Sequence, residues 1–376
     1  MWKSAKIGDV CDIRRGASPR PIQNFLSDKG MPWVKIADAT ADSSRYITET
    51  KECIIPEGVS KSLEVHPDDL IVSNSATPGL PKIMKINACI HDGWLLLSNF
   101  RGVTRDFLYY KFIDIRSHLV NQANGSVFQN LKTDIVRDFD IQIPSTAEQN
   151  NIVEILHSLD DKIELNNQIN RNLEEQAKAI FNSVYDKAVN QVSFTSIISI
   201  ASGGTPRTSE SSFWNGNIPF FTPKDVGFPF ALNTEKYITD DGLNNCNSRL
   251  YPTNTTFITA RGTVGKLSLA AIPMAMNQSC FALVSERKNP ILIYMYAIRA
   301  VDSLKKKSNG AVFDAITIKD FETERVNKLS DEEIKSLSSV IEPIYNQIRL
   351  NTIENHRLSD LRDSLLPKLM SGDLGV

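Results

Sequence analysis

The chain has 376 residues, of which 41% are hydrophobic and 23% are charged, and its formal net charge is −2. This is ordinary globular composition, and the length suits two or three domains, so neither a disordered chain nor a strongly basic, histone-like one is expected. No run approaches the roughly 18 apolar residues of a membrane span, and the amino terminus lacks the apolar core of a signal peptide, so we expect a cytoplasmic protein without a membrane partner.

The cysteines indicate neither a disulfide framework nor a metal centre. There are five, they are scattered, and none of them forms a CxxC pair. An odd number without such spacing favours reduced thiols over disulfides or a zinc site. We therefore expect these cysteines to be reduced and mostly buried.

Residues 1–144 are predicted to form an α+β lobe. Short apolar runs alternate with turn residues, which is typical of strands joined by tight turns. The segment 107–119 differs, because its apolar residues recur at helical spacing. The lobe is therefore not purely β.

Residues 145–192 are predicted to form a helical segment. Ser145 stands three residues before Glu148, the spacing of a capping box at a helix start. Apolar residues, Ile163 and Leu173 among them, then recur three and four apart, which indicates a narrow seam of coiled-coil type. The polar segment 158–161 could cap a restart of this helix.

Residues 193–329 repeat the first lobe, and residues 330–376 repeat the helical segment. Five blocks return in the same order at a separation of about 185 residues. The matches are 16–20 with 203–207, 32–34 with 219–221, 124–128 with 309–313, 145–148 with 330–333, and 163–166 with 348–351. We interpret this pattern as a tandem duplication. The second lobe is also predicted to be α+β, with a helix over 293–304 that follows a helix-start pair.

The second helical segment opens with its own capping box, Ser330 and Glu333, and its seam includes Ile348 and Leu358. Pro343 lies within the segment, and a proline removes a backbone donor and clashes with the preceding turn. We therefore expect the helix to break or restart there.

The two helical segments are the natural partners of each other, because a narrow apolar seam needs a second helix. A whole lobe joins them, which leaves room for an antiparallel arrangement with one lobe at each end, a dumbbell. Asn166 aligns with Asn351 and Asn170 aligns with Asn355, on or beside the seam. These asparagines are interpreted either as buried polar layers that fix register or as exposed flanks of the stripe.

The charges are not spread evenly. The two lobes are slightly basic, and both helical segments are acidic. A contact with a phosphate backbone is therefore expected on the lobes. Arg14, Arg15 and Arg20 surround the first Gly-to-Pro turn and Arg207 follows the second, so we favour DNA contact over a solvated loop there. For Lys305–Lys307, a solvated face and a phosphate clamp are equally favoured.

No catalytic constellation is found in the sequence. There is no GxxxxGK[ST] phosphate loop, no GxGxxG, no HExxH and no GxSxG. The five histidines have no metal-like spacing. We expect neither catalytic residues nor a metal site in this chain.

Nearly the whole chain resembles the specificity (S) subunit of type I restriction-modification systems. The resemblance rests on Gly203–Pro206, on Ala260–Gly265, on Asn277 with Gln278, and on residues 309–313. Glu148 with Gln149, the continuation Ile163–Asn167 and the ending Leu365–Gly372 also carry it. The first lobe departs from the pattern at residues 75–79, where the usual arginine is absent, and at His91 with Asp92, where Asn-Gln is common.

The resemblance implies a non-catalytic, sequence-specific DNA reader with two target-recognition domains, 1–144 and 193–329, and two helical spacers, 145–192 and 330–376. Each domain would read one half of an asymmetric, bipartite target in double-stranded DNA, and the helices would set the gap. Two methyltransferase subunits would dock on the helices, and motor-nuclease (R) subunits would join them. S-adenosylmethionine, ATP and Mg are expected on those partners, with no cofactor in this chain.

Sequence is read by side chains that reach base edges, while phosphate contacts set the register. The expected DNA-binding residues are polar or basic and lie in the repeated turns or in the loops beside them. They are Arg14, Arg15, Arg20, Lys35, Asn74, Ser75 and Lys82 in the first lobe, and Thr205, Arg207, Lys224, Arg261, Thr263 and Lys266 in the second. The expected helix seam contains Ile163, Asn166, Leu173, Ile348, Asn351 and Leu358.

Two other functions remain open. The first is a DNA methyltransferase fused to its own recognition domain, which would need a cofactor pocket and a catalytic motif. The second is a two-headed scaffold that clasps a protein or another polymer. Methyl transfer by the isolated chain would support the first. Selection from random duplexes tests the second, because a scaffold should enrich no split consensus.

Overall fold

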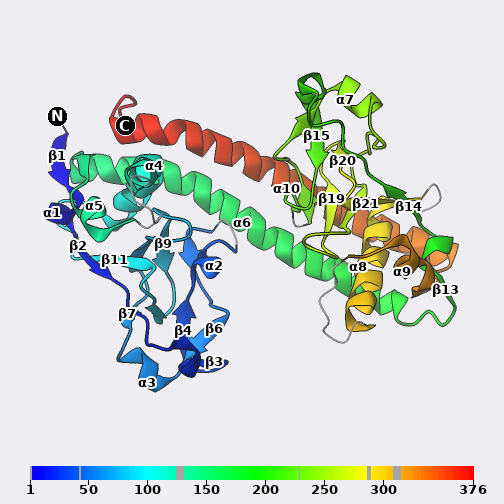
Figure 1. Cartoon of the computed structure of the whole chain (residues 1–376), viewed down its shortest axis with the longest axis horizontal. Coiled ribbons are helices and arrows are strands. Elements are labelled where there is room, and N and C mark those ends of the chain that lie inside the picture. Colours follow the sequence, from blue (N-terminus) through cyan, green and yellow to red (C-terminus); the bar gives the residue numbers. More distant parts are fainter. Residues whose placement is uncertain (1, 42–43, 124–130, 228, 286–288, 308–314) are drawn as a thin grey trace. The chain divides into compact units, whose positions relative to one another are not determined.

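The computed structural model describes residues 2–41, 44–123, 131–227, 229–285, 289–307 and 315–376 (Figure 1). It divides into two compact units, one made of Met1–Glu164 with Leu358–Val376 and the other of Leu165–Arg357. Each unit contains an α+β lobe and a part of both long helices. The repeated segments 124–128 and 309–313 lie outside the described residues.

The first unit contains two five-stranded sheets and a two-stranded ribbon. One sheet has the order β2-β11-β8-β9-β5 and the other β3-β6-β4-β10-β7, while β1 pairs with β12. The strands of the first sheet are β2 (Asp12–Arg15), β5 (Tyr46–Ile47), β8 (Leu70–Ser73), β9 (Pro81–Met84) and β11 (Trp94–Ser98). The others are β1 (Lys3–Lys6), β3 (Leu26–Ser27), β4 (Met31–Val34), β6 (Glu52–Ile54), β7 (Leu63–Val65), β10 (Ala88–Ile90) and β12 (Asp140–Ile143).

Short helices surround these sheets, and one longer helix completes the core of the lobe. They are α1 (Ile7–Val10), α2 (Ile36–Ala39), α3 (Pro56–Val59), α4 (Arg105–Ala123), α5 (Thr133–Arg137) and the 3-10 turn η1 (Ile22–Asn24). Phe107, Leu108 and Phe112 of α4 are fully buried in one cluster with Leu70 and Leu95 of the sheet. The helix predicted over residues 107–119 from the spacing of its apolar residues is therefore present as part of α4.

The second unit repeats this arrangement. Its main sheet has the order β14-β21-β18-β19-β16, a smaller sheet has the order β17-β15-β20, and β13 pairs with β22. The main strands are β14 (Ser199–Ser202), β16 (Phe230–Ala231), β18 (Thr256–Thr259), β19 (Leu267–Ala270) and β21 (Cys280–Val284). The others are β13 (Gln191–Ser193), β15 (Trp214–Phe221), β17 (Tyr237–Ile238), β20 (Ala275–Met276) and β22 (Arg325–Asn327). The helices are α7 (Asp240–Asn244), α8 (Pro290–Lys307) and α9 (Ile318–Thr323), with the 3-10 turns η2 (Phe194–Ser196) and η3 (Ser211–Phe213).

The two main sheets have the same register as well as the same order. Leu70 of β8 lies opposite Ile83 of β9, and Thr256 of β18 lies opposite Leu269 of β19. In each lobe the short last strand of the sheet pairs parallel with its neighbour, while the other pairs are antiparallel. The predicted duplication of an α+β lobe is therefore confirmed by the fold.

Two long helices cross from one unit into the other along the chain: α6 (Thr146–Tyr185), with 40 residues, and α10 (Asp331–Ser371), with 41. In the first unit the start of α6 packs with the end of α10, where Ile152 and Leu156 share a core with Leu369. In the second unit the later part of α6 packs with the earlier part of α10, where Phe181 shares a core with Ile341. The helices therefore run antiparallel, as predicted.

The predicted break at Pro343 is wrong, because α10 continues through it. Pro343 lies on an exposed face, so the carbonyl freed one turn earlier, that of the exposed Ser339, can bond to water. Ile341 and Tyr345 on either side are fully buried and hold the helix in place. Helix α6 likewise continues through residues 158–161 without a restart.

The two capping boxes differ in detail. At the start of α10, the Ser330 backbone N–H donates to the Glu333 carboxylate at 2.8 Å, and the Glu333 N–H donates to Ser330 Oγ at 3.3 Å. At the start of α6, only the contact from the Glu148 N–H to Ser145 Oγ at 3.3 Å is formed. The Glu148 carboxylate accepts instead from Trp2 Nε1 at 2.9 Å, which ties the amino terminus to this helix.

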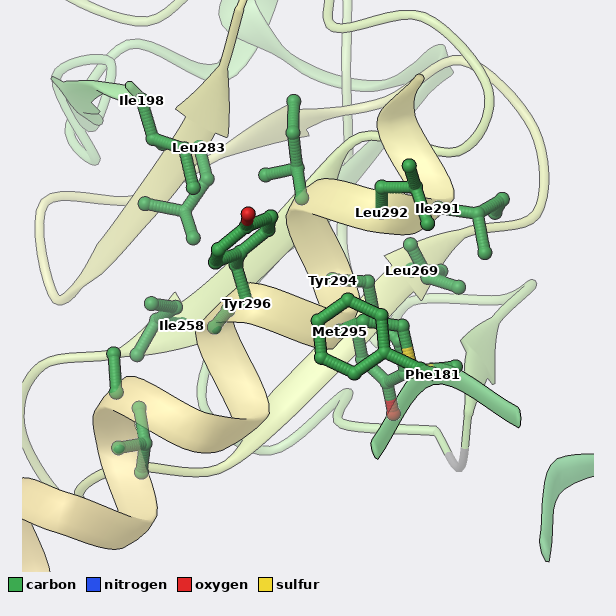
Figure 2. Close-up of a cluster of buried hydrophobic side chains, with 14 of the residues drawn as sticks. Phe181, Ile198, Ile258, Leu269, Leu283, Ile291, Leu292, Tyr294, Met295 and Tyr296 are labelled. Carbon is green, nitrogen blue, oxygen red and sulfur yellow. The ribbon is translucent and has the colours of Figure 1, made fainter. Parts of the chain in front are cut away.

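Each lobe is attached to its part of the helix pair by a different chemistry. In the first unit Tyr110 donates to Asp160 of α6 at 2.7 Å, and Arg362 of α10 binds the same carboxylate at 2.8 Å. In the second unit the contact is aromatic and apolar: Figure 2 shows Phe181 of α6 beside Tyr294 and Met295 of α8, with Leu269 of the sheet nearby.

The cysteines are free thiols, and Cys11, Cys89 and Cys280 are buried, as expected. Burial raises the pKa of the Cys11 thiol to about 12 and that of Cys89 to about 11, so both are protonated at neutral pH. None of the helices in the described part of the chain has the apolar length that a bilayer crossing requires.

Candidate nucleic-acid interface

The first lobe brings three loops together at one end of strands β2, β8 and β11. We call them the Gly16 turn (residues 16–20), the Ser73 loop (residues 73–80) and the His91 loop (residues 91–93). Their counterparts in the second lobe are the Gly203 turn (residues 203–207), the Thr259 loop (residues 259–266) and the Asn277 loop (residues 277–279).

Glycine is required where the turn passes the neighbouring loop. A Cβ on Gly16 would lie 2.1 Å from the His91 carbonyl oxygen, and a Cβ on Gly203 would lie 2.1 Å from the Asn277 carbonyl oxygen. Atoms at that distance overlap, so any other residue would push the two segments apart. The repeated glycine therefore allows each turn to lie directly against its partner loop.

A hydroxyl group organises the Ser73 loop and the Thr259 loop in the same way. Ser73 Oγ donates to the Thr77 carbonyl and accepts from the Leu80 N–H at 3.0 Å. Thr259 Oγ1 donates to the Thr263 carbonyl and accepts from the Lys266 N–H at 3.0 Å. The two lobes therefore build one loop framework from different side chains.

Backbone conformation follows the same pattern. Ala76 and Gly79 have φ values of 55° and 76°, and Gly262 and Gly265 have φ values of 81° and 72°. Alanine rarely adopts a positive φ. Ala76 nevertheless has this conformation, at the position where the Thr259 loop has Gly262, so the two loops share one backbone shape.

In the first lobe, three predicted residues converge on Asp92. Arg15 Nε donates to the Asp92 carbonyl at 2.9 Å, and its guanidinium lies 3.9 Å from the Asp92 carboxylate. Arg20, whose side chain is 82% exposed, lies 3.6 Å from that carboxylate, and Asn74 Nδ2 donates to the Asp92 carbonyl at 3.1 Å. Arg14 is exposed on β2, opposite Leu96.

The Asp92 carboxylate is ionised at neutral pH. A hydrogen bond from Ser18 Oγ at 2.6 Å is the main cause that lowers its pKa, with smaller contributions from nearby charges that include Arg15. Burial lowers the pKa of the adjacent His91, so that imidazole is neutral at pH 7. A cavity of about 520 Å³ opens beside these groups, with Arg20, Lys35, His91 and Asp92 among its lining residues.

The other predicted residues of the first lobe differ in exposure. Ser75 is partly exposed in the Ser73 loop, and Lys35 forms an ion pair with Glu52 at 2.5 Å. Asn74 and Lys82 are 3% and 4% exposed, and the Lys82 ammonium donates to the Ser44 carbonyl. Neither Asn74 nor Lys82 presents its side chain to solvent, so neither is available to contact a duplex.

In the second lobe the predicted residues are exposed on the equivalent loops. Thr205 Oγ1 donates to Gln278 Oε1, and the Arg207 carbonyl accepts from Trp214 Nε1 at 3.2 Å. The side chains of Arg261 and Lys266 are exposed on the Thr259 loop. Thr263 donates to the Pro223 carbonyl at 3.3 Å, and the neighbouring Lys224 pairs with Glu235 at 3.2 Å.

The predicted seam residues lie on α6 and α10, where the asparagines form a cross-helix amide network. Asn166 Nδ2 donates to Glu354 and to Asn355, both at 2.8 Å, and Asn351 Nδ2 donates to Asn170 at 2.8 Å. Asn166 is 1% exposed. The apolar members Ile163 and Ile348 are buried, while Leu173 and Leu358 are partly buried.

Sequence analysis did not select Asp92 and Gln278 as site residues, although the loops meet at them. The signal was present, because His91 with Asp92 was the place where the first lobe departed from the Asn-Gln pattern of the second. Among the described residues, no group of three or more His, Cys, Asp or Glu side chains is arranged to hold a metal ion.

Comparison with known proteins identifies the architecture. Residues 1–175 and 187–359 each match the model of the type I restriction modification DNA specificity domain. The chain is 22% identical to the type I restriction enzyme MjaIX specificity subunit of Methanocaldococcus jannaschii, over all of this chain and 94% of that protein. It is 20% identical to the HindI specificity subunit of Haemophilus influenzae, over 68% of this chain and 73% of that one.

A solved structure has the same fold. The crystal structure of the type I restriction-modification S subunit from M. genitalium superposes with a TM-score of 0.59 at 15% identity, covering 98% of this chain and 96% of that one. Both lobes, with their repeated loop framework, fall within matches to the family model, so the chain belongs to the type I restriction-modification DNA specificity family and carries two copies of its domain.

Proposed function

We propose that this chain is the non-catalytic subunit that gives a type I restriction-modification complex its DNA sequence specificity, with one half of an asymmetric, bipartite target read by each lobe. One observation carries the proposal: the same three-loop framework is built twice, and its exposed positions carry different side chains. A shared framework with unlike contact residues suits two unlike half-sites.

The proposed contact surface consists of the exposed or partly exposed residues on and beside these loops. Cationic and hydroxyl side chains can bind the phosphates of the DNA backbone, and they can also bind base edges in the major groove. In the first lobe they are Arg14, Arg15, Arg20, Lys35 and Ser75, and in the second they are Thr205, Arg207, Lys224, Arg261, Thr263 and Lys266.

Membership of the family supports a proposal about the partners. We propose that two methyltransferase subunits dock on the helical segments 145–192 and 330–376, and that R subunits complete the complex in the cytoplasm. S-adenosylmethionine, ATP and Mg belong to those subunits. The recognition domains are proposed to comprise residues 1–144 and 193–329. Family membership favours this function over a fused methyltransferase or a general scaffold.

The test is methylation by the reconstituted complex. The full chain would be co-expressed with the methyltransferase subunit of its own system, and the complex would be incubated with a library of random duplexes before methylated adenines are mapped. A split consensus with two different halves is expected. Methylation without a consensus, or a chain that never co-purifies with the methyltransferase, would contradict the proposal.

Exchange of a lobe tests whether each lobe reads its own half-site independently. Replacing residues 193–329 with the corresponding lobe of another specificity subunit should change one half of the consensus and leave the other half unchanged. A change in both halves would show that the lobes do not read independently.

A further inference from the structure

We propose that positions 92 and 278 determine which base pair each lobe accepts at one position of its half-site, Asp92 with its two arginines selecting a G·C pair and Gln278 an A·T pair. This inference rests on the proposed function and goes beyond it by naming the residues and the base chemistry.

The two positions are structurally equivalent. Asp92 follows β10 and Gln278 follows β20, and each is anchored to a hydroxyl group of the neighbouring turn: Ser18 Oγ donates to Asp92 Oδ1, and Thr205 Oγ1 donates to Gln278 Oε1. Each also precedes a strand that pairs with two neighbours, β11 between β2 and β8 or β21 between β14 and β18 (Figure 1). The geometry is therefore repeated while the chemistry is not.

The chemical difference is a change of charge and of hydrogen-bonding capacity. Asp92 is a carboxylate with 41% of its side chain exposed, and it lies between the guanidinium groups of Arg15 and Arg20. Gln278 is an exposed neutral amide. On β14, the positions equivalent to Arg14 and Arg15 are Ala201 and Ser202, so the second lobe has two arginines fewer beside its turn.

The first group matches the major-groove edge of a G·C pair. That edge presents two acceptors on guanine, N7 and O6, and one donor on cytosine, the N4 amino group. An arginine supplies donors for the guanine and a carboxylate accepts from the cytosine. Arg15 Nε donates to the Asp92 carbonyl at 2.9 Å, while the contacts of the two guanidinium groups with the carboxylate, at 3.6 and 3.9 Å, are longer than hydrogen bonds and leave the terminal nitrogens able to donate to guanine.

The second group matches adenine. A glutamine amide carries a donor and an acceptor that pair with N7 and the N6 amino group of adenine. The hydrogen bond from Thr205 uses one of the two lone pairs of Oε1, which leaves the second lone pair and the NH₂ group for a base. A carboxylate at the same place could not donate to N7.

The experiment maps methylation by the complex, as above, with three variants of the full chain. D92N keeps the shape and the acceptor for Ser18 but removes the charge, D92Q copies the amide of the second lobe, and Q278E gives the second lobe a carboxylate. Glu57→Gln, at an exposed site on α3, is the matched charge control.

We expect D92N and D92Q to lower the preference for G·C at one position of the first half-site by about tenfold, with the second half-site unchanged. Q278E should lower the preference for A·T at one position of the second half-site only. The control should leave both halves unchanged.

An unaltered consensus in all three active variants would overturn the inference, and so would a uniform loss of methylation on every sequence by complexes that assemble normally. If the Asp92 variants do not fold, Q278E alone decides. Failure of the wild-type complex to give any split consensus would count against the proposed function itself, so the two failures are distinguishable.

Discussion

At the scale of single residues, the close contacts of the Gly16 turn make a specific prediction about stability. A Cβ at residue 16 would lie 2.1 Å from the His91 carbonyl oxygen, which is backbone and cannot rotate away. We expect Gly16→Ala to lower the free energy of unfolding by about 1–3 kcal/mol, the usual cost of overpacking. Urea unfolding would measure it. Gly375→Ala is the control, because that site has open space, and an equal effect of both changes would refute the argument.

Glu174 makes a prediction about pH. Burial raises the pKa of its carboxyl group above the ordinary value of 4.5, although Lys178 lies 2.7 Å away and opposes the shift. The folded state therefore holds a proton that the unfolded state releases as the pH rises above about 4.5, so this group lowers the free energy of unfolding with rising pH.

Glu174→Gln should accordingly stabilise the protein at pH 7, and the gain should vanish as the pH falls below the ordinary value of 4.5. Thermal unfolding across a pH series would show this. Glu175→Gln, at the exposed neighbour on the same helix, should give no such pH dependence. A gain from Glu174→Gln that is constant with pH would show that ionisation is not its cause.

At the scale of elements, the amide network decides how α6 and α10 pair. Asn166 is buried and donates to both Glu354 and Asn355, so truncating it removes two cross-helix hydrogen bonds, one of them to a carboxylate. We expect Asn166→Ala to cost about 1–3 kcal/mol in free energy of unfolding. The matched change Gln168→Ala, at an exposed amide two residues further on, should cost less than about 0.5 kcal/mol. Equal costs would mean that the network contributes no stability.

The two lobes have the same order of elements, but the side chains that pack each lobe against the long helices differ. In the first lobe the contact with the helix segments is polar and charged, and it is made by Tyr110, Asp160 and Arg362. In the second lobe the contact is an apolar core that contains Phe181, Tyr294 and Tyr345. Duplicated elements therefore kept their positions while the side chains between them diverged. This divergence is compatible with lobes that read different sequences.

At the scale of the whole molecule, both long helices contribute residues to both compact units. If the helix pair sets the gap between half-sites, then removing four aligned residues from each helix removes about 6 Å of helix. The preferred gap should shorten by about one or two base pairs, with both half-sites unchanged. Mapped methylation by the reconstituted complex measures the gap directly. An unchanged gap would show that these helices do not set the distance between the half-sites.

The sequence by itself determined the features that depend on short-range patterns. The two helix starts at Ser145 and Ser330 and the glycines of the two turns could be predicted, because capping, helical periodicity and turn formation involve residues only a few positions apart. The duplication could also be recognised, because comparing the sequence with itself requires no knowledge of which residues touch. The antiparallel pairing of the helices also followed, because each seam needed a partner and the chain offered one.

Only the tertiary structure decided where distant residues meet. Ser18 and Asp92 are far apart in the chain and come together because β2 pairs with β11, and the same pairing brings Arg15 to the Asp92 carbonyl. The tertiary structure also buries Lys82, which the sequence could not distinguish from an exposed lysine. Helix α10 continues across Pro343 because the residues on both sides of the proline are buried. Burial and convergence depend on the packing of the whole lobe, and no local pattern encodes them.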